Sequence, residues 1–259
     1  MSKNTSINVE TLLPQIVKMP VVRVNREEFL TKELKVYYPK ELVSDAVIHS
    51  PAYAGIPLSF IDKTAKHIIN YETNKVSALS FAAGLPGGLA MHGTVSADIT
   101  QYFVFMLRVL QKLAYLYSYP DFELKEEKLS DETLNSLIVF IGVMVGAQGA
   151  NAAVGILTKT ITDKVVKAIP RKALTKTTVW YPLVKKVAKA IGIKMTKPVL
   201  AKSASKVIPV LGGVASGGIS YVSFKLSANR LKKKLREMPL CDPESELYSR
   251  HKKNSSEDE

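Results

Sequence analysis

The sequence predicts an all-α fold, a compact bundle of helices that pack tightly through glycine-rich faces, with little or no β structure. Helix-start signatures recur along the chain, apolar residues repeat at helical spacing, and long uncharged stretches are rich in small residues. The 259 residues suffice for one sizeable domain or at most two small ones. We expect one helical domain over residues 21–236, a flexible lead-in at 1–20 and a disordered polar tail at 237–259.

Three helices are expected in the first third of the chain. Asn25 stands three residues before Glu28, which is the spacing of a helix N-cap. Pro39 suits the first turn of a second helix that ends near His49. Pro57 opens a third helix, and its apolar stripe indicates a face buried in the core: Leu58, Ile61, Ala65, Ile68 and Ile69.

A long helix is expected over residues 94–117. Apolar side chains cover most of its circumference, so it should be enclosed by other helices. One narrow polar stripe remains, formed by Asp98, Gln101, Arg108 and Lys112. Asp98 and Arg108 are ten residues apart, about 15 Å along a helix axis, so each needs a partner elsewhere.

Residues 133–158 carry no charge, and Ser130 provides a helix start just before them. The wholly apolar part of this run is 11 residues, which favours a buried helix over a membrane span of about 20 residues. Two glycine pairs have the Gly-x-x-x-Gly spacing that lets helix backbones approach closely: Gly142 with Gly146, and Gly213 with Gly217. Such faces pair within a bundle, inside a bilayer or between copies of the chain, and the sequence leaves these alternatives open.

The charge is distributed unevenly. Residues 151–240 contain 19 Lys and Arg but only two acids, a net charge of +17, whereas the rest of the chain sums to −4. A clustered positive field attracts polyanions, so the basic half of the domain (151–236) predicts an anionic partner. Because the cations alternate with apolar residues at helical spacing, we expect a membrane surface.

Residues 179–194 form the clearest amphipathic segment. The apolar face comprises Leu183, Val184, Val187, Ala188 and Ile191. Lys185, Lys186, Lys189 and Lys194 would supply attraction to an anionic bilayer, with Trp180 and Tyr181 at the interface. The alternative is an ordinary helix whose apolar face packs on the core while the lysines are solvated.

The termini and the cysteine content indicate a cytoplasmic protein. The N-terminus has no apolar run of signal-peptide length, Ser2 stands where N-myristoylation needs glycine, and the C-terminus has no prenylation motif. Cys241 is the only cysteine, which excludes an intramolecular disulfide, and its polar surroundings indicate an unreactive thiol. The hypothesis is a non-enzymatic protein that associates peripherally with the anionic inner membrane surface or with a membrane protein there.

Two other functions remain open. An enzyme or small-molecule binder would place its site at the helix break between Gly84 and Asp98, lined by Gly87, Gly88, His92, Asp98 and Gln101. The sequence has no motif for a catalytic nucleophile, metal or cofactor, so none of these is assigned. A nucleic-acid binder is less favoured, because the basic region contains few aromatic residues to stack on bases.

Four blocks resemble the bacterial EcsC family, which is named for a gene beside an ABC exporter operon. They are Ala83-Gly-Leu-Pro-Gly-Gly-Leu-Ala90, Ser96-Ala-Asp98-Ile, Gln111-Lys-Leu-Ala-Tyr-Leu-Tyr117 and Val207-Ile-Pro-Val-Leu-Gly-Gly-Val-Ala-Ser-Gly-Gly218. The similar region covers roughly residues 76–235. The resemblance implies a helical, membrane-associated protein and supplies no catalytic residues. An accessory role in export, membrane stress or defence is the corresponding expectation.

Overall fold

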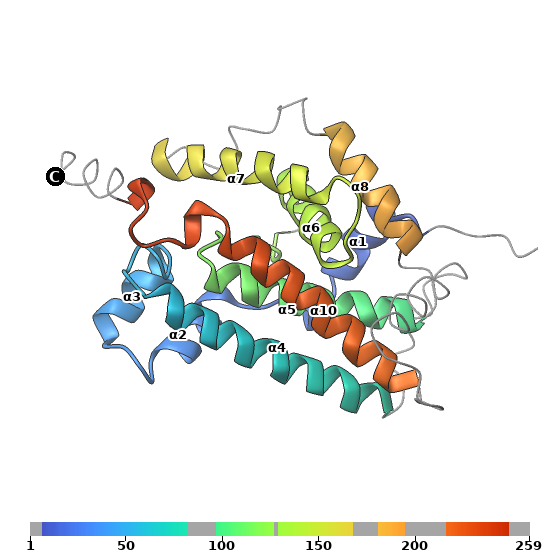
Figure 1. The fold of residues 1–259 in the computed structure, drawn as a ribbon, viewed down its shortest axis with the longest axis horizontal. Coiled ribbons are helices and arrows are strands. Elements are labelled where there is room, and N and C mark those ends of the chain that lie inside the picture. The colour runs from blue at the N-terminus through green and yellow to red at the C-terminus, as the bar shows by residue number, and fades with distance from the viewer. Residues whose placement is uncertain (1–6, 82–96, 127–128, 168–180, 195–215, 249–259) are drawn as a thin grey trace, which may run out of the picture.

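The computed structural model describes residues 7–81, 97–126, 129–167, 181–194 and 216–248. Within this part of the chain every regular element is helical and none is a strand, which confirms the predicted all-α fold (Figure 1). In chain order the helices are α1 (Val9–Val17), a 3-10 helix (Pro20–Val22), α2 (Arg26–Leu34), α3 (Lys40–Ile48), α4 (Leu58–Phe81), α5 (Ala97–Leu116), α6 (Asp131–Met144), α7 (Ala150–Lys167), α8 (Tyr181–Lys194), α10 (Ser216–Arg236) and a second 3-10 helix (Pro239–Cys241).

Helix α5 lies at the centre of the bundle. It contacts α1, α2, α4, α6 and α10, and nearly all its side chains from Phe103 to Leu116 are buried. The long helices α4 and α10 run side by side, and this is the most extensive helix pairing in the described part (Figure 1). Enclosure of α5 on most sides is therefore confirmed.

The cations in the polar stripe of α5 have partners on other elements, as the sequence required. The Arg108 guanidinium donates to the carbonyl oxygen of Val21. Lys112 forms an ion pair with Glu72 of α4, whose side chain is almost fully buried. Burying one charge without its partner would be costly, so the stripe anchors α5 to its neighbours.

Gln111 fixes the segment that precedes α2. Its buried side-chain amide donates to the carbonyl oxygens of Val22 and Leu107, both at 2.8 Å. Its carbonyl oxygen accepts from the amide of Val24 at 3.0 Å. Two of these three hydrogen bonds reach the segment before α2 and satisfy backbone groups there, and the third, to Leu107, stays within α5.

The predicted helix starts are confirmed. Asn25 caps α2 by accepting from the amide of Glu28 at 3.1 Å. Ser130 caps α6 in the same way through the amide of Thr133, also at 3.1 Å. The apolar stripe expected after Pro57 lies on α4, where all its members except the half-buried Leu58 are buried.

Residues 7–20 are part of the core, so the expectation of a flexible lead-in over 1–20 is wrong for them. Asn8 caps α1 by accepting from the amide of Thr11 at 3.2 Å. The buried side chains recur three and four residues apart: Val9, Leu12, Leu13, Ile16 and Val17. The prediction overlooked this stripe because Pro14 and the neighbouring polar residues suggested irregular structure.

Residues 237–248 are packed as well, so the disordered tail predicted for 237–259 begins too early. Five side chains of this segment are buried against the bundle: Met238, Leu240, Cys241, Leu247 and Tyr248. The Tyr248 hydroxyl donates to the carbonyl oxygen of Leu240. The prolines and acidic residues dominate the composition and conceal these few apolar contacts. Residues 249–259 lie outside the described part.

The two glycines of the first Gly-x-x-x-Gly pair have different roles. Gly142 faces α8, and a Cβ placed there would overlap Cγ1 of Val187, so close packing within the bundle is confirmed for it. Gly146 follows the C-cap Val145 and has φ +64°, a left-handed conformation that ends α6. The interpretation of the pair as one helix face is therefore wrong. Gly213 and the surroundings of Gly217 lie outside the described part.

Among the helices described, none combines the length and the apolar character that crossing a membrane requires.

Candidate functional site

Helix α8 carries most of the residues that the sequence assigned to membrane binding. One face of α8 packs on α1 and α6, where Val184, Val187, Ala188 and Ile191 are buried and Leu183 is half-buried. The close approach depends on Gly142 of α6 and on Gly192, where an added Cβ would overlap the carbonyl oxygen of Ile7. The apolar face is thus occupied by the core. For the apolar face the structure therefore agrees with the alternative stated above, a helix whose apolar face packs on the core.

The opposite face of α8 is exposed. Tyr181, Lys185, Lys189 and Ile193 follow one another at intervals of four residues and form one row. Lys186 is exposed beside them, and together these five residues are called the α8 ridge. Tyr181 is 52% exposed and Ile193 is 51% exposed, so an accessible apolar side chain lies at each end of the row of lysines.

Of the residues predicted to bind a membrane, Lys185 and Tyr181 contact each other, whereas Lys194 and Trp180 are not part of the α8 ridge. The ammonium group of Lys185 lies 4.7 Å from the centre of the Tyr181 ring, a cation–π arrangement that holds both outward. Lys194 is half-buried at the end of α8 and lies away from the ridge, near Gly146. Trp180 lies outside the described residues.

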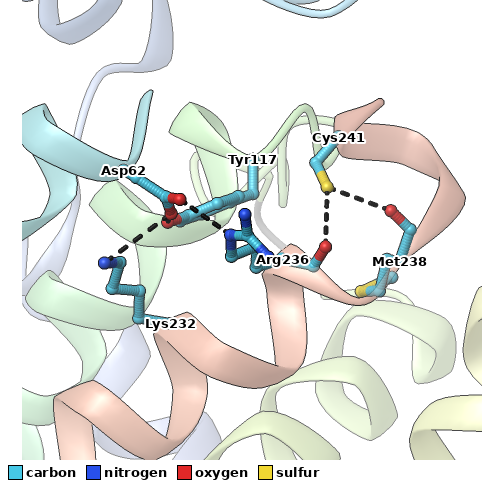
Figure 2. A network of polar contacts seen from close by, with 6 residues as sticks. All are labelled: Asp62, Tyr117, Lys232, Arg236, Met238 and Cys241. Carbon is cyan, nitrogen blue, oxygen red and sulfur yellow. Dashed lines mark hydrogen bonds and ion pairs between the residues drawn. The ribbon is translucent and has the colours of Figure 1, made fainter. Parts of the chain in front are cut away.

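Part of the basic charge is neutralised within the fold. Asp62 of α4 accepts from the Arg236 guanidinium at 2.7 Å and lies 3.6 Å from the Lys232 ammonium (Figure 2). Lys234 pairs with Glu237 at 2.9 Å. The uneven charge along the chain therefore has a structural component, since Asp62 of α4 attracts two cations of the basic α10.

The Asp62 carboxylate is held in its charged form. Burial alone would raise its pKa, but the hydrogen bonds from Tyr117 (2.6 Å) and Arg236 and the charges of Lys232 and Arg236 outweigh burial and lower the pKa. Burial and the same carboxylate raise the pKa of the Tyr117 hydroxyl, which keeps it a donor. These hydrogen bonds and ion pairs link the helices to one another. Among the described residues, no exposed nucleophile lies beside them.

Cys241 is buried close to this network. Its thiol donates to the carbonyl oxygens of Arg236 and Met238, both at 3.1 Å (Figure 2). Burial, with a further contribution from the charge of Asp242, raises the pKa of the thiol to about 11. A thiol with so little thiolate is a weak nucleophile, which agrees with the unreactive cysteine expected from the sequence.

The alternative small-molecule site at the helix break is largely outside the described part of the chain. This applies to Gly87, Gly88, His92 and the side chain of Asp98. Gln101 is half-buried on α5. Among the residues that the structure describes, no group of three or more His, Cys, Asp and Glu side chains is placed to hold a metal ion.

Sequence reasoning missed a second basic feature, a cavity between the α6–α7 turn and α10. Arg230, Lys233 and Lys234 line it from α10, and Gly146 lines it from the turn. The signal available in the sequence was Gly146, directly after the apolar run, together with the close spacing of the cations on α10. Gly146 and the cations of α10 come together only through a long-range contact, which no local sequence pattern predicts.

Comparison with known proteins finds no matching family model, no similar curated protein and no similar solved structure. The resemblance to the EcsC family therefore stays a hypothesis. The fold and the site together describe an all-α bundle with a basic, partly apolar ridge on α8.

Proposed function

We propose that this protein associates peripherally with an anionic membrane surface and that the α8 ridge makes the contact. One observation carries the proposal: three exposed lysines lie between two exposed apolar side chains, Tyr181 and Ile193, on a single helix face. Other large apolar side chains are exposed elsewhere on the described surface, but Tyr181 and Ile193 flank a row of lysines on one helix, which is the combination that an interfacial contact uses.

The contact would be mainly electrostatic. Each lysine near an anionic bilayer contributes about 1 kcal/mol, and this attraction decays over a Debye length of about 8 Å at physiological salt. Because the apolar face of α8 is buried against α1 and α6, only the side chains of Tyr181 and Ile193 would reach the headgroup region. Tyrosine is enriched at membrane–water interfaces. Binding should therefore be reversible and weakened by salt.

The biological setting follows from the sequence and from the resemblance. The proposed location is the cytoplasmic side of the cell membrane, and the proposed role is accessory to export, membrane stress or defence. The α8 ridge favours a membrane over nucleic acid, because Tyr181 is the one aromatic residue described on this face that could stack on a base, and Lys185 already covers one side of its ring.

Co-sedimentation with vesicles tests the proposal. The protein should bind phosphatidylglycerol vesicles in low salt, release them in raised salt and ignore phosphatidylcholine vesicles. The triple variant K185Q/K186Q/K189Q should bind at least tenfold more weakly, since it removes three contributions of about 1 kcal/mol each.

The matched control is K32Q/K35Q/K66Q, which removes the same charge from exposed lysines of α2 and α4. It should retain wild-type binding. Equal losses in both variants would mean that net charge, not the α8 ridge, controls binding. No binding to any vesicle would reassign the ridge to a protein or nucleic-acid partner.

A further inference from the structure

We propose that the cavity between the α6–α7 turn and α10 binds a phosphate group. The cavity has a volume of about 360 Å³. Gly146, Ala150 and Asn151 line one wall, and Arg230, Lys233 and Lys234 line the other. This volume is at the lower end of the range for small-molecule pockets and suits a compact, charged group.

Two cations meet at Gly146. The point that a Cβ on Gly146 would occupy is 3.6 Å from Nη1 of Arg230 and 3.9 Å from Nζ of Lys194. The two nitrogen atoms are therefore at most 7.5 Å apart, the sum of these distances. Gly146 has no side chain to fill the space between them. A single anion with several oxygens could contact both.

The cations in and beside the cavity are balanced by an acid only in part, since the pKa of Glu237 is lowered by the hydrogen bond from Lys234 and by the charges of Lys234 and Lys233. Glu237 is the one carboxylate among the described residues that line the cavity. It pairs with Lys234 at 2.9 Å. In the described part of the chain, no carboxylate forms an ion pair with Lys194, Arg230 or Lys233. Lys232 and Arg236, on the same helix, are matched with Asp62, so the fold does pair its cations where no cavity is present.

Among the cations without an ion pair, a structural contact is described for Arg230 alone. Arg230 donates from Nη1 to the carbonyl oxygen of Met144 at 3.3 Å and so satisfies the C-terminal end of α6. This contact also orients the guanidinium, which has five N–H donors and can offer the others to a ligand. Lys194 and Lys233 have no such contact with the end of α6 among the described hydrogen bonds and ion pairs.

The chemistry of the cavity selects a multiply charged oxyanion. An arginine fork forms paired hydrogen bonds with phosphate, and two lysines add point charges. The first turn of α7 also faces the cavity at Asn151, where backbone amides lack an intrahelical acceptor. A diphosphate carries about enough charge for three cations, and a phosphate monoester carries enough for about two. A carboxylate would leave two of them uncompensated.

Two sources would present this group: the headgroup of an anionic lipid and a soluble phosphorylated compound. Lys194 is the last residue of α8, so the cavity adjoins the element proposed to contact a membrane. The phosphate site nevertheless rests on the cavity alone. The phosphate site does not depend on the α8 ridge, because Lys194, Arg230 and Lys233 do not belong to that ridge.

Calorimetric titration with inorganic phosphate and with pyrophosphate, at constant ionic strength and in phosphate-free buffer, tests the site. Wild-type protein should show saturable binding with one ligand per chain, tighter for pyrophosphate. R230Q/K233Q should weaken binding at least tenfold. The control K32Q/K35Q removes the same charge from two exposed lysines at α2, outside both proposed sites, and should change the dissociation constant less than twofold. Because R230Q also removes the bond to Met144, K233Q alone provides a second variant, and a threefold or larger loss is expected.

Vesicles distinguish the two sources. If lipid headgroups are the source, vesicles with phosphatidic acid should bind better than phosphatidylglycerol vesicles of equal surface charge, and R230Q/K233Q should abolish the preference. Binding of pyrophosphate without any such preference assigns the site to a soluble ligand. The proposal is overturned if neither soluble probe saturates and the vesicle preference is absent, or if K32Q/K35Q loses as much pyrophosphate binding as R230Q/K233Q. Failure of the α8 ridge alone would leave these results unchanged.

Discussion

Asp62 is the residue at which the acidic and basic parts of the chain meet. Its carboxylate accepts from Tyr117 of the α5 C-terminus and from Arg236 of α10 and lies near Lys232. The side chain is 24% exposed, so water screens part of this attraction. The interaction nevertheless joins three helices through one side chain, which makes it the clearest place to measure what the charge asymmetry contributes to the fold.

D62N should lower the free energy of unfolding at pH 7 by about 1 kcal/mol, a value reduced for solvent screening. The pKa of Asp62 in the folded protein lies below its ordinary value of 3.8. The charged carboxylate therefore stabilises the fold above about pH 4, and this contribution is lost as the pH falls through the lowered pKa. Urea denaturation of wild type and D62N between pH 7 and pH 2.5 should show the difference shrinking in acid. A difference that grows in acid would contradict this assignment.

Cys241 should react slowly in the native protein. Raising the thiol pKa from 9.0 to about 11 reduces the thiolate fraction at pH 8 about 100-fold, and burial adds a steric barrier. Labelling with a disulfide reagent should be at least 100-fold slower for native protein than for protein unfolded in urea. Comparable rates would show that the segment after α10 opens readily.

At the scale of elements, the packing of α8 on α6 decides which face of α8 is available for binding. Gly142 allows the approach, since Val187 occupies the space that a side chain there would take. An amphipathic sequence pattern marks two faces but does not say whether the apolar one is covered by the same chain. In this protein it is covered by α1 and α6, and the exposed face carries the lysines.

Substitution of two helical glycines should separate close packing from helix propensity. G142A should destabilise the protein by about 1–3 kcal/mol, because the added methyl overlaps Val187. G155A in α7, where nothing lies within 4 Å of the added methyl, should stabilise it by about 0.5–1 kcal/mol. Chemical denaturation of both variants measures this. A stabilising G142A would mean that α6 and α8 are further apart than described.

At the scale of the whole molecule, the two ends of the described chain complete the core. Helix α1 packs on α5, α6 and α8, and the segment 237–248 returns after α10 to bury Leu240, Leu247 and Tyr248. The Ser50 hydroxyl donates to the Tyr248 hydroxyl at 3.5 Å, which connects this segment to the region after α3. The bundle is thus closed by contacts between residues nearly 200 positions apart.

L247A should therefore destabilise the whole protein. Leu247 is buried, and a Leu-to-Ala change in a core costs about 2–5 kcal/mol; a value near 2–3 is expected at this edge of the bundle. The control E244A changes an exposed residue of the same segment and should alter stability by less than about 0.5 kcal/mol. Thermal denaturation distinguishes them, and equal midpoints would show that the segment does not contribute to the cooperative unit.

The predictions that succeeded depend on neighbours in sequence. Asn25 and Ser130 start helices because a side chain reaches an amide three residues ahead, and α5 was recognised from the spacing of its apolar residues. Two of the predictions that failed assigned disorder from composition alone. Residues 7–20 and 237–248 contain prolines and charges, yet a few apolar side chains suffice to bury each segment.

The sequence by itself determined that this chain is helical, where most helices begin, and that its positive charge is concentrated in the second half. These properties arise from local hydrogen bonds and residue periodicity. Only the tertiary structure decided which cations are free: Asp62 neutralises two of them, the α8 ridge exposes three, and the turn at Gly146 brings Lys194 and Arg230 together. Such assignments depend on the distance between residues far apart in the chain, and charge interactions follow distance in space rather than position in sequence.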